Sequence, residues 1–170
     1  QVLHIKGVNW SPVPRGASYP EGLDFSGFVD RDAPLMRDAG INAVRTYETI
    51  TDRRVLDVLW DHGIFVLNTV YGWGGAPVNS TADRVNAVID HPAILMWVIG
   101  NEWNYNGLYA GLNIDQSVQR INAVAAVVKQ ADPSRPVATI YGEMPSRQLM
   151  DRLAIIDAWG LNVYRGIGFG

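Results

Sequence analysis

The sequence predicts an α/β fold built on a parallel sheet, because apolar runs of strand length alternate with segments of helical periodicity. The apolar runs are continuous rather than alternating with polar residues, which is typical of parallel strands that are covered on both faces. Several helical segments end at residues that commonly stop a helix, namely Gly40, Gly63 and Pro133. We find no linker or low-complexity segment, so one domain of repeated strand–helix units is expected over residues 1–170.

A strand is expected wherever a short apolar run is bounded by turn residues, and a helix wherever apolar residues recur every three or four positions. The predicted strands are residues 2–8, 42–46, 64–70, 94–99, 137–141 and 158–163. The predicted helices are residues 29–39, 52–62, 82–90, 114–131 and 147–153. The segment "NST" at 79–81 fits an N-glycosylation pattern and also the polar start of a helix, and we favour the helix start.

The loops after the strands favour a TIM (β/α)8 barrel over a doubly wound dinucleotide-binding sheet. A dinucleotide fold needs a G-x-G-x-x-G turn after its first strand, whereas "VNWSPVPRGAS" is a long, proline-rich loop. The segments "GWGG" (72–75) and "GIGFG" (166–170) follow strands without opening a helix at that spacing, so we interpret both as loops. In a barrel, residues that follow the strands converge on the C-terminal face, where active sites lie. The polar and aromatic residues in these positions are Asn9, Trp10, Arg45, Tyr47, Tyr71, Trp73, Asn101, Glu102, Trp103, Tyr141, Glu143, Asn162 and Tyr164.

Charge and composition argue against several classes of partner and cofactor. The net charge is −3 with acids and bases interleaved, so we expect no binding of nucleic acid or of a membrane surface. No run approaches the ~18 apolar residues that a membrane span needs. The absence of cysteine excludes disulfides, thiolate metal sites and a cysteine nucleophile. His4, His62 and His91 have no further ligand at metal-binding spacing, so neither a metal nor another cofactor is expected.

The segment "HPAILMWVIGNE" (91–102) resembles the fourth strand of retaining glycoside hydrolases of clan A, in which an Asn-Glu pair ends the strand. The resemblance extends to "IKGVNW", which ends at Trp10, to "AGINAVRTY" (39–47) and to "DAWGLNVYRG" (157–166). Within the clan, the segment 91–102 is most similar to the barrel domain of family 2 enzymes, the β-galactosidases and β-glucuronidases. The segments "KGVNWSPVP" (6–14) and "GNEWNYN" (100–106) resemble glucanosyltransferases about equally. The resemblance implies a β-glycoside hydrolase or transglycosidase whose substrate is an oligosaccharide or polysaccharide.

The resemblance also implies roles for individual residues. Glu102 matches the acid/base of the clan, and Asn101 is expected to hydrogen-bond the sugar hydroxyl next to the reacting carbon. Arg45 matches an arginine that keeps the partner carboxylate ionised, with a structural salt bridge as the alternative. Tyr164 is expected either to hydrogen-bond the nucleophile or to stack in the core.

The chemistry gives an independent reason to look for paired carboxylates. Cleaving an acetal needs an acid that protonates the leaving oxygen and a second carboxylate that meets the developing oxocarbenium ion. Glu102, at the mouth of an apolar strand, suits the first role, its alternative being an ordinary exposed loop glutamate. Asn162 is expected to bind substrate, and Glu143 to contact substrate or to be structural rather than to act as the nucleophile.

The tryptophans divide into two groups by position. Those that follow strands, where an indole face can stack on a sugar ring, are Trp10, Trp73 and Trp103. The alternative for one of these three is that it only covers the core. Those that lie within predicted elements, and are expected to pack, are Trp60, Trp97 and Trp159.

Length adds one expectation about the reaction. A complete barrel typically needs about 250 residues, and the predicted strands match its first six. The clan nucleophile is a glutamate at the end of strand seven, so we expect it beyond Gly170 and expect the chain alone to be inactive, with the rest of the barrel as its partner. The alternative is a non-catalytic carbohydrate-binding partial barrel. Because the sequence begins with Gln1 rather than Met, we interpret it as a processed protein or an excised domain, and a secreted or periplasmic location is favoured.

Overall fold

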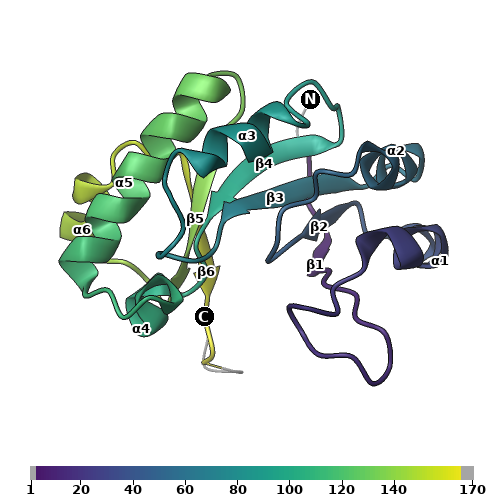
Figure 1. Cartoon of the computed structure of the whole chain (residues 1–170), viewed down its shortest axis with the longest axis horizontal. Helices are drawn as coiled ribbons and strands as arrows, with labels where there is room; N and C mark the ends of the chain where they lie inside the picture. Colours follow the sequence, from purple (N-terminus) through teal and green to yellow (C-terminus); the bar gives the residue numbers. More distant parts are fainter. Residues whose placement is uncertain (1–2, 166–170) are drawn as a thin grey trace. The chain divides into compact units, whose positions relative to one another are not determined.

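The computed structural model describes residues 3–165 and consists of parallel strands that alternate with helices (Figure 1). The strands are β1 (Gly7–Asn9), β2 (Ala43–Arg45), β3 (Phe65–Tyr71), β4 (Ile94–Ile99), β5 (Val137–Gly142) and β6 (Ala158–Asn162). The helices are α1 (Phe25–Asp38), α2 (Arg53–Asp61), α3 (Ser80–Asn86), α4 (Trp103–Asn106), the 3-10 turn η1 (Gly107–Tyr109), α5 (Ile114–Ala131) and α6 (Arg147–Arg152). The strands are hydrogen-bonded in chain order from β1 to β6, which confirms the predicted parallel α/β class.

The predicted element bounds are largely confirmed, with clear exceptions at the first strand and at the predicted helix 82–90, whose counterpart α3 ends at Asn86. The prediction of residues 2–8 for the first strand is wrong, because β1 begins only at Gly7, and residue 2 lies outside the described residues. Asn42 holds the segment before β1 with its side chain as well as its backbone. Its Oδ1 accepts from the Lys6 N–H at 2.7 Å, its Nδ2 donates to the His4 carbonyl at 2.8 Å, and its N–H donates to the Lys6 carbonyl at 2.9 Å.

Helix ends follow the local capping chemistry. α1 begins four residues before the predicted start because the Asp24 carboxylate accepts the Gly27 N–H at 2.8 Å and caps the helix there. α3 begins at Ser80, which confirms that 79–81 starts a helix. Gly40 and Gly63 have φ of 76° and 71°, so the left-handed helix ends predicted for these glycines are also confirmed.

The first compact unit comprises Gln1–Thr69 and Ala87–Leu95. In this unit α1 packs against α2, and fully buried aliphatic side chains form the core, among them Val29, Val44, Leu56, Leu59 and Val66. Its two segments are joined by the ion pair of Arg53 and Asp90, whose closest atoms are 2.7 Å apart.

The second compact unit comprises Val70–Asn86 and Met96–Gly170, and α5 lies beside α3 in it (Figure 1). α5 begins in a capping box, in which Asn113 and Gln116 each accept the other's backbone N–H at 2.9 Å. Trp97 is fully buried and donates its indole N–H to Asp132 at 2.9 Å, which confirms the predicted packing role.

The other two tryptophans within elements also contact aromatic neighbours. Trp159 in β6 is half-buried and meets the Tyr141 ring edge to face at 5.8 Å between centroids. Trp60 in α2 packs on Phe65 in the same manner at 5.6 Å, but it remains 41% exposed and is therefore not a core residue.

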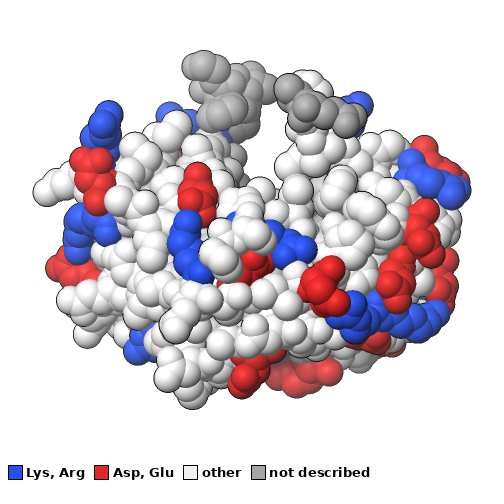
Figure 2. Space-filling model, turned by 90° about the horizontal axis from the view of Figure 1, so that it is seen from above, with Lys and Arg blue, Asp and Glu red and all other residues white. Residues whose placement is uncertain are grey.

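Charged side chains of opposite sign lie next to one another over the face drawn in Figure 2. The ion pairs of the structure include that of Lys129 and Asp157, with Nζ 2.8 Å from a carboxylate oxygen. The interleaved charges of the sequence are thus paired locally in the fold. Between residues 3 and 165, the structure contains no helix that is both long enough and apolar enough to cross a membrane.

Candidate active site

Glu102 follows β4 directly and has an unusual backbone conformation. Its φ of 48° and ψ of 37° are left-handed, a region that non-glycine residues rarely occupy. Two kinds of backbone bond hold it there: its N–H donates to the Ile140 carbonyl at 2.9 Å, and its carbonyl accepts from the Tyr105 N–H at 2.8 Å as α4 begins. Such conformations persist only when surrounding bonds determine them, and they gather at functional sites. The backbone of Glu102 therefore favours a functional role for this residue.

Both hydrogen bonds to the Glu102 carboxylate reach the same oxygen. Asn162 donates its Nδ2–H to Oε1 at 2.9 Å, and the Tyr164 hydroxyl donates to Oε1 as well. The Asn162 amide is also 3.3 Å from Oδ1 of Asn101, so four predicted site residues lie together in the second unit. Among residues 3–165, Oε2 of Glu102 accepts no hydrogen bond.

The position of Tyr164 contradicts one of its two predicted roles. The side chain is 73% exposed, so the prediction of core stacking is wrong. Its hydroxyl donates to Glu102, the predicted acid/base, because Tyr164 follows β6 closely enough to reach the end of β4. A bond to a nucleophile is a prediction that the described residues do not test.

Glu143 follows β5 and pairs with an arginine that the sequence did not single out. Its Oε2 accepts from Nε of Arg165 at 2.9 Å and from Nη2 at 2.6 Å. The Glu143 backbone is also left-handed, with φ of 76°, and its N–H donates to the Asn162 carbonyl at 3.0 Å. Of the two predicted roles, these contacts support the structural one.

A pair of hydrogen bonds beside the site, between Asn104 and Gly142, was also not predicted from the sequence. Asn104, in α4, donates to the Gly142 carbonyl and accepts the Gly142 N–H, each at 2.8 Å. The ring of Tyr105 lies over Gly142, where an added Cβ would be 2.2 Å from a ring carbon, so a larger residue would have to displace this ring. The only signal in the sequence was the cluster of asparagines after Glu102, a residue type that readily bonds to backbone.

Trp103 and Trp10 do not present a face to solvent, and the prediction that they stack on sugar is wrong. Trp103 is 1% exposed, and its indole N–H donates to the Thr139 hydroxyl at 2.9 Å. Trp10 is 6% exposed, donates to Asp32 at 2.9 Å and packs against the Phe25 ring. Both indoles turn back into the protein, where buried N–H groups find partners.

Trp73 is different, because it is 58% exposed on a well-anchored loop. The Tyr71 hydroxyl donates to the Gly74 and Ala76 carbonyls at 3.2 and 2.9 Å. Arg120 of α5 donates Nη1 to the same two carbonyls and to the Tyr71 hydroxyl. The loop therefore displays an exposed indole on a fixed backbone.

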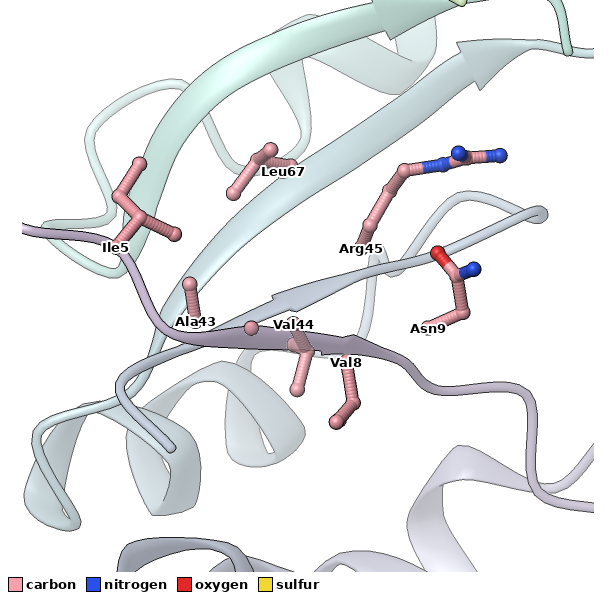
Figure 3. Close-up of a pocket in the computed structure, with 8 residues that line it drawn as sticks. Ile5, Val8, Asn9, Ala43, Val44, Arg45 and Leu67 are labelled. Carbon is pink, nitrogen blue, oxygen red and sulfur yellow. The ribbon is translucent and has the colours of Figure 1, made fainter. Parts of the chain in front are cut away.

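Arg45 belongs to the first unit, at the carboxyl end of β2. It is paired in register with Asn9 of β1, and both side chains point to the same side of these strands (Figure 3). The guanidinium carbon of Arg45 lies 4.8 Å from the centre of the Tyr47 ring. An open hollow on this side is lined by Ile5, Gly7, Asn9, Ala43, Arg45 and Leu67. Its role toward a partner carboxylate stays a prediction.

Comparison with known proteins identifies the family. Residues 71–165, more than half of the chain, match the family described as "Glycosyl hydrolases family 2, TIM barrel domain". The chain is 28% identical over 153 residues to a β-galactosidase of Photobacterium profundum, covering 79% of this chain and 13% of the relative. It is 28% identical over 132 residues to a β-glucuronidase of Pongo abelii, covering 71% of this chain and 19% of the relative.

A solved structure, the β-glucuronidase of Bacteroides uniformis, has the same fold with a TM-score of 0.71 at 19% identity, covering 94% of this chain and 20% of that chain. The predicted TIM-barrel fold class is thereby confirmed, as is the resemblance to family 2. The chain spans less than a fifth of the length of the curated relatives named above. It belongs to the glycosyl hydrolases of family 2, within the part that forms their TIM barrel domain.

Proposed function

We propose that this chain is the acid/base-bearing part of a retaining β-glycoside hydrolase or transglycosidase that acts on an oligosaccharide or polysaccharide. The observation that carries the proposal is the geometry of Glu102, a strand-end carboxylate in a left-handed backbone with one oxygen held by two donors. Relatives named β-galactosidase and β-glucuronidase support a β-glycoside as the substrate.

The two donors give the carboxyl group of Glu102 a defined direction. Because Asn162 and Tyr164 both bond to Oε1, the proton needed by the leaving oxygen sits best on Oε2, which accepts no bond from residues 3–165. Glu102 then protonates the leaving oxygen in the first step and removes a proton from water, or from an acceptor sugar, in the second.

The remaining predicted residues have supporting roles in this proposal. Asn101 accepts from Asn162 through Oδ1, which orients its amide nitrogen as the donor toward a sugar hydroxyl. Arg45 stabilises the ionised nucleophile, a glutamate that we place after Gly170 on the basis of the family resemblance. The exposed indole of Trp73 stacks on a pyranose ring of the substrate.

The test is Glu102→Gln in the complete protein, assayed on phenyl and dinitrophenyl β-glycosides of the same sugar. We expect turnover of the phenyl glycoside to fall by ~10² to 10⁴, since that is the usual contribution of general acid catalysis. The dinitrophenolate leaves without protonation, so formation of the glycosyl–enzyme from that substrate falls much less. The matched control, the exposed Glu21→Gln, keeps parental rates on both. Parental turnover of the phenyl glycoside by Glu102→Gln would show that Glu102 is not the acid.

A further inference from the structure

Hydrogen bonds link the ends of three neighbouring strands, β4, β5 and β6, in a closed ring that includes Glu102. The Glu102 N–H donates to the Ile140 carbonyl of β5 at 2.9 Å, joining the end of β4 to β5. The Glu143 N–H donates to the Asn162 carbonyl at 3.0 Å, joining the end of β5 to β6. The Asn162 side chain returns to Oε1 of Glu102 at 2.9 Å and closes the ring.

Glu143 contacts the residues on both sides of Tyr164, the second donor to Glu102. Its backbone N–H bonds to Asn162, and its carboxylate bonds to Arg165 at 2.9 and 2.6 Å. Tyr164 lies between these two anchored residues and donates its hydroxyl to Glu102. A single residue that follows β5 therefore fixes the short segment that carries both donors to the Glu102 carboxylate.

Stability alone does not explain a glutamate at this position. Its φ of 76° is a conformation that glycine adopts without strain and that other residues adopt at a cost. The ion pair with Arg165 is partly open to water, with side-chain exposures of 58% for Arg165 and 32% for Glu143, so it stabilises the fold little. What the carboxylate provides that glycine does not is the fixed position of Arg165.

We infer that Glu143 is a positioning residue for the acid/base: through Arg165 and Asn162 it holds the two donors against Oε1 of Glu102. The inference rests on the proposed function of Glu102. When the anchor is lost, Tyr164 is no longer held in place and the Glu102 carboxyl group samples other rotamers, so steps that need a proton from Oε2 slow down. Steps that do not need this proton, and binding of the substrate itself, are unaffected.

The experiment compares Glu143→Gly, Glu143→Gln and Arg165→Met in the complete protein. Glu143→Gly removes the strained backbone together with the carboxylate, so its melting temperature stays close to the parental value and separates folding from function. We expect each variant to lower kcat for the phenyl β-glycoside about 10- to 100-fold, as misplaced catalytic groups do. KM, and glycosyl–enzyme formation from the dinitrophenyl glycoside, should stay near the parental values. Glu21→Gln is the control for a glutamate that does not contact the site.

A double-mutant cycle tests whether Glu143 acts through Tyr164. Since both residues serve the same carboxylate, Glu143→Gly should lower kcat little further in a Tyr164→Phe background. Fully additive losses would overturn the inference, and so would equal losses on both substrates with a raised KM, which would indicate a direct substrate contact. If Glu102→Gln slows the phenyl glycoside but Glu143→Gly does not, only this inference fails; if Glu102→Gln has no effect, the proposed function fails as well.

Discussion

Strained backbone at single residues gathers in one part of the second unit. Among residues 3–165, the non-glycine residues with positive φ are Glu102, Leu108, Tyr109 and Glu143. All four lie in segments that follow β4 or β5, and two of them are carboxylates with polar partners in the site. Left-handed conformations at non-glycine residues cost about 1–2 kcal/mol each. Strained backbone of this kind near Glu102 is expected for a preorganised site, in which the backbone fixes the orientation of the side chains.

Asp132 is the residue whose ionisation contributes most clearly to stability. It follows α5, and its side chain is only 2% exposed. Burial raises the pKa of this carboxyl, but hydrogen bonds from Ser134, Trp97 and Arg135 outweigh burial and lower the pKa from 3.8 to about 2. A carboxyl whose pKa is lowered in the folded state stabilises it at pH values above the unfolded pKa.

This stabilisation is therefore fully present above about pH 4 and is lost as the pH falls toward 2, amounting to about 2 kcal/mol. We expect Asp132→Asn to lower the melting temperature at neutral pH and to flatten its decline over that acidic range. Asp151→Asn, at a carboxylate 67% exposed, is the control and should melt like the parent. If the melting temperatures of the parent and of Asp132→Asn fell in parallel from neutral to acidic pH, the lowered pKa of Asp132 would not contribute to stability.

At the scale of elements, periodicity predicted the long helices and the buried strands but not the short helices that shape the site. The predicted helix 114–131 matches α5 at both ends, because a capping box and a long apolar stripe agree there. α4 has only four residues, too few for any periodic signal. It forms because Glu102 turns the chain out of β4 and Asn104 is locked to Gly142.

The same limit applies to the site residues. The positions of Asn101 and Glu102 could be predicted because both closely follow an apolar strand, and that of Asn162 because it ends one. The pairing of Arg165 with Glu143, 22 residues apart, and of Asn104 with Gly142, 38 residues apart, depends on which strands become neighbours. Sequence position also could not separate the buried Trp103 from the exposed Trp73, because the residues that Trp103 contacts, Thr139 and Tyr141, lie on β5.

The loop at 72–76 supports a prediction about binding. Arg120 anchors this loop from α5, so Arg120→Met should weaken oligosaccharide binding about as much as Trp73→Ala does. A lost stacking contact of about 1 kcal/mol corresponds to roughly a fivefold increase in Kd. Arg152→Met, which removes only a surface pair with Asp115, is the matched control. Calorimetric titration of the complete protein with an oligosaccharide substrate measures the effect.

Thermal melts of the same variants separate binding from folding. Trp73→Ala should melt like the parent because the indole is 58% exposed, whereas Trp97→Ala should lose about 3–5 kcal/mol through a core cavity. Unchanged sugar affinity in Trp73→Ala and Arg120→Met would show that this loop does not bind the substrate.

At the scale of the whole molecule, the proposed reaction needs a second carboxylate that faces Glu102 across the sugar. Glu143 is poorly suited, because its carboxylate is paired with Arg165 and it follows β5, the direct neighbour of β4. In the proposed function, which follows the family resemblance, the nucleophile is a glutamate at the end of a seventh strand. A nucleophile there can approach the face of the anomeric carbon opposite the leaving group, which a carboxylate on the adjacent strand cannot do.

The stereochemistry of the product tests this arrangement. A retaining enzyme holds its two carboxyl groups ~5–5.5 Å apart and forms a covalent glycosyl intermediate, whereas an inverting enzyme holds them ~6.5–9.5 Å apart around a water molecule. We therefore expect the complete protein to release the β anomer first from an aryl β-glycoside, as followed by proton NMR before mutarotation. Azide should rescue Glu102→Gln by attacking the accumulated intermediate and giving the β-glycosyl azide. An α anomer as the first product would mean that the partner of Glu102 activates water instead, and the assignment of a strand-seven nucleophile would then be wrong.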